Sequence, residues 1–234
     1  MTIKKNVAPI KVFVAIPNQG NVSCHVAQKL IQMVGESIVN KNFDITLKFS
    51  QVTCIDFNRN LLARQFLESD CQWLFMMDDD NPCLKNPLDL IELNKDVIVY
   101  PTLMQKTLDN GDPLVIYNIF RRVKDGCWGA ITRAGGPALV EVDAGGTGCV
   151  LIKRKVIAAL EAPFKSKMKR DGTRKYGQDL YFCERAKKKG FKIWTHWDYA
   201  CQHFKTIDLI EVARMLLRDK YKVKPEVREL VKKI

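Results

Sequence analysis

Apolar runs and amphipathic stretches alternate along the first eighty residues. Residues 11–16 form an apolar run of strand length, and a helical apolar pattern follows at about residues 22–39. A second strand is predicted at residues 44–49, and Asp56 is predicted as the N-cap of a second helix. A buried strand at residues 73–77 completes a β-α-β-α-β order. This order predicts a largely parallel sheet with right-handed crossovers.

The remainder of the chain is less regular. A fourth strand is predicted at residues 97–100, and glycine-rich, strand-like pieces follow at residues 102–140. A helix at residues 178–189 and a strand at residues 191–195 come next. We expect one α/β domain over residues 1–205, with a mixed, mostly parallel sheet flanked by helices. A C-terminal helix and basic tail over residues 206–234 would pack on this domain or extend from it.

Composition narrows the class of protein. The 234 residues are 47% hydrophobic, which suffices for one substantial core, and the net charge of +12 predicts an anionic ligand or partner. The eight cysteines form no Cys-x-x-Cys pair, so neither a zinc ribbon nor a secreted disulfide scaffold is expected. No stretch reaches the length of a transmembrane helix, and the first apolar run is too short for a signal peptide. A cytoplasmic protein with reduced thiols is predicted.

Three carboxylates follow the buried strand at residues 73–77. Asp78, Asp79 and Asp80 would project into the crevice at the carboxyl end of the sheet, where ligands of open α/β sheets bind. Asp78 and Asp80 are spaced to share a divalent ion, and their hard oxygen atoms suit Mg²⁺ or Mn²⁺. A solvated acidic turn is the alternative interpretation, and it carries about equal weight for this run alone.

A second acidic position lies about a hundred residues later. Asp179 falls in the first turn of its predicted helix, on the side of the apolar stripe, so its carboxylate is expected to face the protein. A carboxylate held there is able to accept a proton from a substrate hydroxyl. The alternative is that Asp179 only caps its helix.

The ordered set of motifs resembles a GT-A glycosyltransferase of the family-2 type, in particular the compact members of phages and large viruses. The set comprises the first strand and turn, the three aspartates, the Gly146-Thr147-Gly148 loop, Gln178-Asp179 and a late histidine, His203. It covers roughly residues 10–205. The resemblance implies the GT-A fold and an inverting transfer from a nucleotide-diphosphate sugar, with a UDP-sugar favoured.

The resemblance also implies roles for individual residues. Asp78 and Asp80 would form the DxD motif, which binds the ribose and the metal-bound diphosphate. Mn²⁺ or Mg²⁺ would be held by Asp78, Asp80 and His203, with Asp80 as the direct ligand. Asp179 would be the catalytic base, and Gln178 stands where the family usually has a glutamate. For His203, a packed or surface imidazole is the alternative.

Other residues are weaker candidates. The nucleotide sugar is expected to contact the turn after the first strand, the helix before the acidic strand and the acidic run itself: Pro17, Asn18, Gly20, Arg59, Arg64, Asp78 and Asp79. A solvated helix face is the more frequent fate of such arginines. The acceptor and the sugar are expected to contact Trp128, Gly146, Thr147, Gly148 and Gln178. The alternatives there are a bulged turn for the glycines and core packing for the tryptophan.

Basic residues crowd the segment just before Asp179, at residues 165–175, and the C-terminal tail. The first cluster would close over a diphosphate or guide an anionic acceptor, and a solvated face is the alternative. A hydroxymethylated base in phage DNA is one acceptor considered, beside glycans, lipid-linked sugars and protein. Two other functions stay open: a nucleic-acid-binding accessory protein on a degenerate transferase scaffold, and a nucleotidyltransferase.

Overall fold

The chain packs into two compact units in a computed structural model. The model describes residues 8–40, 42–107, 113–123, 127–133, 135–206 and 212. The first unit comprises Met1–Met104 and Ile116–His203, and the second comprises Gln105–Val115 and Phe204–Ile234. Apart from residues 206 and 212, the predicted C-terminal helix and tail lie outside the described residues.

The predicted β-α-β-α-β order of the N-terminal part is confirmed. The five elements are β1 (Ile10–Asn18), α1 (Cys24–Asn40), β2 (Phe43–Gln51), α2 (Ile55–Glu68) and β3 (Trp73–Met77). The predicted N-cap of the second helix is wrong, because Cys54 is the N-cap residue and Asp56 lies inside the first turn. The Asp56 carboxylate instead accepts hydrogen bonds from the backbone N–H and the hydroxyl of Ser166, at 3.0 and 2.8 Å.

Short strands dominate the other described residues. The elements are η1, a 3₁₀ helix (Pro87–Leu93), β4 (Val97–Val99), β5 (Leu103–Thr107), β6 (Pro113–Tyr117), β7 (Ile119–Arg122), β8 (Trp128–Ala130), β9 (Leu139–Val142), β10 (Ala144–Gly145), β11 (Cys149–Lys153), α3 (Arg154–Ala158), β12 (Lys167–Met168), β13 (Arg174–Tyr176), α4 (Gln178–Lys188) and β14 (Ile193–His196). None of the helices among the described residues is long and apolar enough to cross a membrane.

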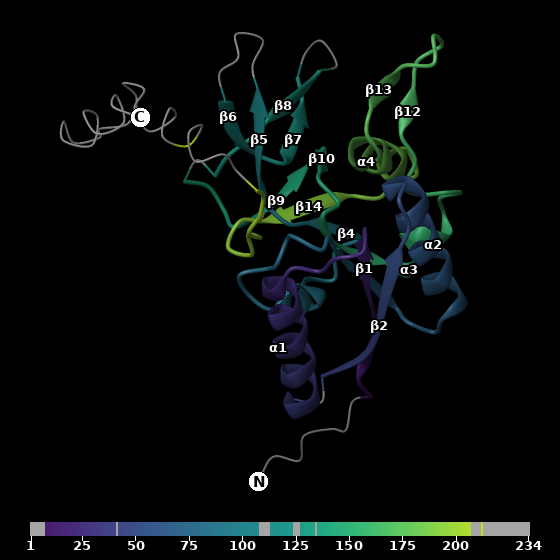
Figure 1. Cartoon of the computed structure of the whole chain (residues 1–234), viewed down its shortest axis with the longest axis vertical. Helices are drawn as coiled ribbons and strands as arrows, with labels where there is room; N and C mark the ends of the chain where they lie inside the picture. The colour runs from purple at the N-terminus through teal and green to yellow at the C-terminus, as the bar shows by residue number, and fades with distance from the viewer. Residues whose placement is uncertain are drawn as a thin grey trace, which may run out of the picture. The chain divides into compact units, whose positions relative to one another are not determined.

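A seven-stranded mixed sheet forms the centre of the first unit (Figure 1). Its strand order is β2-β1-β3-β11-β4-β14-β9. The pairings make β2, β1, β3, β4 and β14 run in one direction, and β11 and β9 in the other. The predicted fold class, an α/β domain with a mixed, mostly parallel sheet, is confirmed.

Alternate residues of each strand enter two separate cores, one on each face of the sheet. Phe13 and Ala15 of β1 pack with α2, α3 and α4, whereas Val12 and Val14 pack with α1 and η1. Figure 1 shows α1 on one side of β1 and β2, and α2 and α3 on the other. Burial on both faces explains why the central strands are continuous apolar runs.

The strand order creates a crevice at the end of β1. β1 pairs in parallel with β2 on one side and with β3 on the other, so the crossovers through α1 and α2 leave on opposite faces. At such a switch point the loops beyond the carboxyl ends of the strands separate and leave room for a ligand. Pro17 and Asn18 at the end of β1, Gly20 beyond it and the aspartates after β3 border this crevice. The prediction that Pro17 and Asn18 lie in the turn after the strand is wrong, because both residues pair with β2.

Candidate active site

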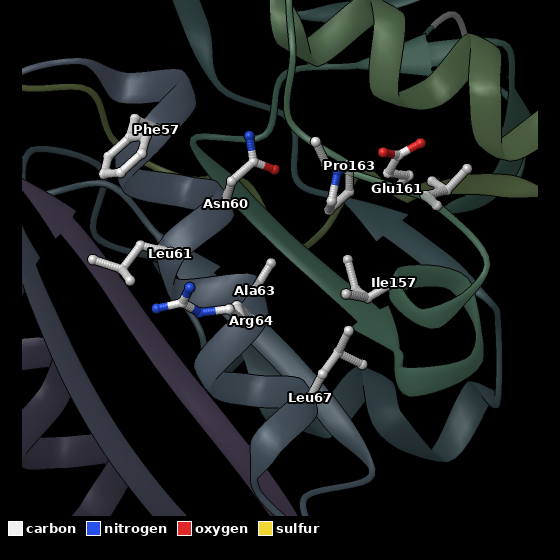
Figure 2. A pocket seen from close by; sticks show the side chains of 11 residues that line it. Phe57, Asn60, Leu61, Ala63, Arg64, Leu67, Ile157, Glu161 and Pro163 are labelled. Atoms are coloured by element: carbon white, nitrogen blue, oxygen red, sulfur yellow. The ribbon is translucent and has the colours of Figure 1, made fainter.

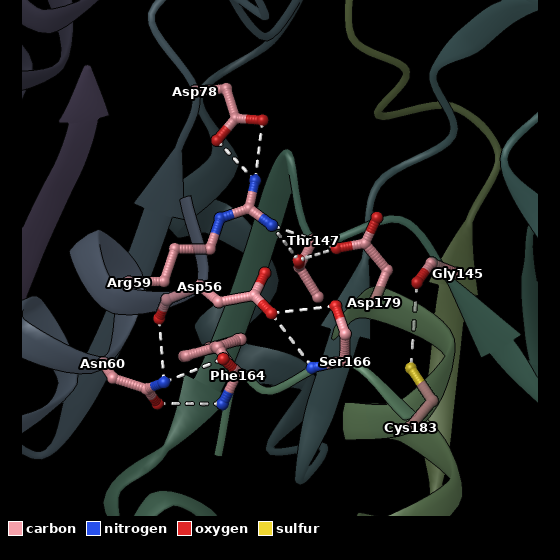
Figure 3. A network of polar contacts seen from close by, with 10 residues as sticks. All are labelled: Asp56, Arg59, Asn60, Asp78, Gly145, Thr147, Phe164, Ser166, Asp179 and Cys183. Carbon is pink, nitrogen blue, oxygen red and sulfur yellow. Dashed lines mark hydrogen bonds and ion pairs between the residues drawn. The ribbon is translucent and has the colours of Figure 1, made fainter. Parts of the chain in front are cut away.

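A buried arginine joins the two acidic positions (Figure 3). Nη2 of Arg59 donates to both carboxylate oxygens of Asp78, at 2.6 and 2.7 Å. Nη1 of Arg59 donates to Oδ1 of Asp179 at 3.0 Å and to the Thr147 hydroxyl at 2.5 Å. The Thr147 hydroxyl in turn donates to Oδ1 of Asp179. One guanidinium therefore connects residues that lie 19, 88 and 120 positions away in the sequence.

The position of Arg59 on α2 explains its burial. Leu62, Ala63 and Phe66, which lie three, four and seven residues later, are buried on the same helix face. The Arg59 side chain is only 3% exposed, so the solvated face considered as its alternative is wrong.

Burial and charge act in opposite directions on this network. Burial lowers the pKa of Arg59, but the charges of Asp78 and Asp179 outweigh it and raise that pKa above its ordinary value. Burial raises the pKa of Asp78, and the Arg59 charge opposes this only in part. Arg59 is thus held permanently charged.

The glycine-rich loop fits closely against the acidic strand tip. The Gly148 carbonyl accepts a hydrogen bond from the Asp78 backbone N–H at 2.7 Å. A β-carbon at Gly148 would lie 2.7 Å from Oδ1 of Asn81 and 2.9 Å from Oδ2 of Asp78, and one at Gly146 would collide with the Asn118 side chain. The backbone of this loop therefore lies against the protein's own polar side chains, and it places Thr147 against Arg59.

Asp179 lies in the first turn of α4, as predicted. Its side chain is 40% exposed, although Oδ1 is held by Arg59 and Thr147. In Figure 3 the second carboxylate oxygen points away from Arg59. One oxygen fixes the orientation of the carboxylate, and the other is directed away from the network. Asp179 is thus more than a helix cap.

Asp80 and His203 face each other beside this network. Nε2 of His203 lies 3.7 Å from Oδ2 of Asp80, and Nδ1 lies 2.8 Å from the Leu103 carbonyl oxygen. Because a carbonyl only accepts, Nδ1 carries the proton, and in the neutral ring Nε2 offers its lone pair toward Asp80. A ring N–H donated to a backbone carbonyl is the usual arrangement of a metal-binding histidine.

These distances fit a divalent cation. Two ligands about 2.1 Å from one ion lie at most about 4.2 Å apart, so the 3.7 Å separation leaves room for a shared ion. Asp78, whose two oxygens both face Arg59, is not part of this pair. The structure brings together two of the three predicted metal ligands.

The predicted nucleotide side of the crevice is held by an asparagine that sequence analysis missed. The buried Asn58 amide donates to the carbonyls of Asn18, Ser50 and Val52, at 3.1, 2.9 and 3.2 Å, and so ties the ends of β1 and β2 to α2. Gly20, two residues after Asn18, has a φ of +113°, a backbone conformation that favours glycine. Asn58 lies four residues before the buried Leu62, and this helical spacing was the sequence signal for its burial.

Asp79 connects the acidic tip of β3 to the loop after β1 through its backbone. Its carbonyl accepts a hydrogen bond from the Ser23 N–H at 2.9 Å, just before α1. The acidic tip of β3 is therefore attached to the loop that follows β1.

Arg64 lies elsewhere. Its side chain is 71% exposed and pairs with Glu68 at 3.6 Å, one helical turn away. It lines a mostly apolar groove of about 430 Å³ between α2 and the segment after α3 (Figure 2). Arg64 therefore lies on a solvated helix face, which was the alternative interpretation of this arginine.

Trp128 is half-buried and Gln178 is buried. The Arg122 guanidinium lies 3.7 Å from the Trp128 ring centre and covers one face of the ring. Gln178 is 7% exposed, and its Oε1 has no hydrogen-bond partner among the described residues. The predicted aromatic platform is therefore already occupied on one side by a cation.

The basic segment before Asp179 forms a hairpin, β12 with β13, whose base is anchored by Glu184 of α4. Lys167 and Arg122 each pair with the Glu184 carboxylate at 2.7 Å, and the Tyr176 hydroxyl donates to it. Burial raises the pKa of Glu184, but hydrogen bonds from Lys167, Tyr176 and Lys188 and the charge of Lys167 lower it to about 2. The remaining basic residues are exposed: Lys165, Lys169, Arg170, Arg174 and Lys175.

Comparisons with known proteins identify the fold. No family model matches the chain, and no curated protein matches it. The crystal structure of A197 from STIV is similar over 84% of this chain and 87% of its own, with a TM-score of 0.54 and 17% identity. This likeness shows a common fold.

Two weaker likenesses are to a glycosyltransferase and to a pyrophosphorylase. A glycosyltransferase involved in the glycosylation of the major capsid of PBCV-1 matches with a TM-score of 0.41 and 12% identity, over 88% of this chain and 100% of that one. UDP-glucose pyrophosphorylase complexed with UDP-glucose matches with a TM-score of 0.40 and 8% identity, over 96% and 99%.

Replacing Arg59 with methionine should destabilise the protein by about 3–5 kcal/mol, because the buried carboxylate of Asp78 would lose its partner. Arg59→Lys should also destabilise it, because the single ammonium group of lysine does not reach both carboxylates as the planar guanidinium of Arg59 does. Urea unfolding measures both. Arg64→Met, on the exposed face of the same helix, is the control and should change stability by no more than about 0.5 kcal/mol. Equal effects at positions 59 and 64 would contradict the role assigned to Arg59.

The Glu184 anchor should make stability depend on acid pH. Because the pKa of Glu184 falls from 4.5 to about 2 on folding, its contribution is present above pH 4.5 and is lost as the pH falls toward 2. The shift corresponds to about 3 kcal/mol. Glu184→Gln should lower the unfolding free energy by about this amount at neutral pH, and the difference should shrink below pH 4.5. Glu68→Gln, an exposed control, should show no such pH dependence.

Proposed function

We propose that this protein is a metal-dependent glycosyltransferase, which moves a sugar from a nucleotide-diphosphate sugar to an acceptor hydroxyl. A UDP-sugar is the favoured donor, and inversion at the anomeric carbon is expected. One observation carries the proposal: Arg59 holds Asp78 and Asp179 in one network at the carboxyl end of the sheet, with Asp80 and His203 beside it.

Asp80 and His203 would hold the divalent ion. A bound Mn²⁺ or Mg²⁺ would neutralise the negative charge that grows on the departing diphosphate. The hydrogen bond from Nδ1 of His203 to the Leu103 carbonyl fixes the imidazole with Nε2 toward Asp80. A nitrogen ligand suits Mn²⁺ better than Mg²⁺, which prefers oxygen.

Asp179 would accept the proton of the acceptor hydroxyl as that oxygen attacks the anomeric carbon. Arg59 and Thr147 fix one oxygen of its carboxylate, so the other is held in a defined direction. Such preorganisation lets a single carboxylate act as base without rearranging during the reaction. In-line attack from the side of Asp179 would invert the anomeric centre.

The donor nucleotide would lie in the crevice between β1 and β3. Pro17, Asn18 and Gly20 would line its base side, and Asp78 and Asp79 would lie on the opposite side. Arg59 supports this site indirectly, because its guanidinium is buried and orients Asp78 rather than presenting a free cation to a phosphate.

The hairpin β12–β13 favours an anionic acceptor. Its exposed lysines and arginines lie on the segment that leads directly to Asp179, and its base is fixed by Glu184. Attraction of a polyanion to these side chains would bring the acceptor near the base. A hydroxymethylated base in DNA is the acceptor with this chemistry that we propose to test first.

Product analysis tests the reaction class. The purified protein is incubated with Mn²⁺, a set of sugar nucleotides, and either hydroxymethylated DNA or glycan acceptors. Release of nucleoside diphosphate together with glycosylated acceptor is expected. Release of pyrophosphate from a nucleoside triphosphate and a sugar phosphate would identify a nucleotidyltransferase instead. Neither product, together with salt-sensitive DNA binding, would indicate a nucleic-acid-binding protein.

Asp80→Asn and His203→Ala should each weaken Mn²⁺ binding more than about 10-fold, because even outer partners of metal ligands change affinity by about 10- to 100-fold. Titration calorimetry with Mn²⁺, with and without UDP-sugar, measures this. Asp70→Asn is the matched control, since Asp70 precedes β3 and its side chain is 72% exposed. Unchanged Mn²⁺ affinity in both site variants would refute the metal site.

Asp179→Asn should keep nucleotide-sugar binding and lower kcat by about 10²- to 10⁴-fold, since the base is removed while Asp80 and His203 are untouched. Binding is followed by calorimetry and turnover by diphosphate release. An equal loss of binding and turnover would argue against the role of Asp179 as base.

A further inference from the structure

Three buried thiols meet close to the segments that carry Asp80 and His203. Sγ of Cys83 lies 3.0 Å from Sγ of Cys149 and 3.2 Å from Sγ of Cys201. The three residues are 2%, 0% and 6% exposed. They come from the loop after β3, from the first residue of β11 and from the segment after β14, and all three thiols are free.

The backbone pairs two of these cysteines directly. Cys83 and Cys201 form an isolated antiparallel β-bridge. The flanking hydrogen bonds run from the Leu84 N–H to the Ala200 carbonyl, at 3.1 Å, and from the Gln202 N–H to the Pro82 carbonyl, at 3.0 Å. This pattern makes Cys83 and Cys201 a non-hydrogen-bonded pair, the closely spaced kind.

The spacing of such a pair suits a covalent link. The Cα atoms of a non-hydrogen-bonded antiparallel pair lie about 4.5 Å apart. Disulfides span Cα separations of roughly 4.4–6.8 Å. The link therefore requires rotation of two side chains and no movement of the backbone.

A bound soft metal ion explains this geometry less well. Sulfur atoms that share a tetrahedral ion at 2.3 Å lie about 3.8 Å apart. The two separations in the structure, 3.0 and 3.2 Å, are both shorter. No fourth His, Cys, Asp or Glu ligand joins the three thiols among the described residues.

We propose that Cys83 and Cys201 are a site of oxidative modification and form an intramolecular disulfide when a peroxide is the oxidant. The sulfur of Cys201, the most exposed of the three, attacks hydrogen peroxide, whose O–O bond breaks to give a sulfenic acid and water. The Cys83 sulfur then attacks that sulfur, and the S–O bond breaks as the S–S bond forms. The hydroxyl leaves as water with the Cys83 proton, so two thiols and one peroxide give one disulfide and two water molecules.

The link would join the two segments of the candidate metal site. Cys83 follows Asp80 by three residues, and Cys201 precedes His203 by two. The Asn81 amide already donates to the Gln202 carbonyl at 3.1 Å, so the segments are in contact before oxidation. Formation of the disulfide does not depend on the proposed function and is measured without any substrate.

The test uses the full-length protein, reduced and then treated with hydrogen peroxide. Free thiols are blocked with iodoacetamide, and peptides are mapped by mass spectrometry without reductant. A Cys83–Cys201 linked peptide is expected, together with a rise in Tm on the order of 10 °C, because the link closes a loop of 118 residues. A thiol reductant should reverse both changes.

Variants separate this link from its alternatives. Cys149→Ala should still form it, and Cys83→Ala should lose both the link and the Tm rise. The wild type and Cys149→Ala decide the outcome even if Cys83→Ala does not fold. Replacement of the exposed Cys24, Cys54 and Cys127 by alanine is the control and should leave the link intact. A link through Cys149, a sulfinic acid without a link, three alkylated thiols or a thiolate-bound metal ion would each overturn the proposal.

Discussion

A permanently charged guanidinium inside the protein requires carboxylate partners, and this requirement organises the candidate site. Arg59 is drawn into the first unit because α2 buries that face, and an unpaired buried charge would be strongly destabilising. Asp78 from the tip of β3 and Asp179 from the start of α4 supply the opposite charges. The acidic strand end, the glycine-rich loop and the last helix of the described chain are thereby fixed around one side chain.

The alternation of apolar and amphipathic segments was enough to predict the architecture. Strand and helix periods are local properties, so β1, α1, β2, α2 and β3 were found near their observed bounds. The general rule for open α/β sheets then placed Asp78 and Asp80 at a crevice without any coordinates. The switch point itself, where β1 lies between β2 and β3, depends on strand order, which local patterns do not encode.

Side-chain partners across the chain were harder to predict. Arg59 and Arg64 are both arginines of α2, yet Arg59 is buried and Arg64 is exposed. Arg59 lies three and four residues before the buried Leu62 and Ala63, and this helical spacing is the sequence signal that distinguishes the two arginines. Asp56 looked like a helix cap but binds Ser166, 110 residues away. The Thr147 hydroxyl also gave no local sign that it would bridge Arg59 and Asp179. Contacts of this kind depend on which helix face meets the sheet.

The absence of a side chain at Gly148 links the substitutions that positions 78, 81 and 148 are able to accept. Even the smallest side chain at this position would press on the carboxylate of Asp78 and the amide of Asn81 at once. A substitution at position 148 would therefore require the Asn81 amide and the Asp78 carboxylate to move, and Arg59 holds that carboxylate in place. Among homologues that keep this loop, a residue other than glycine at position 148 should be accompanied by a change at position 78 or 81.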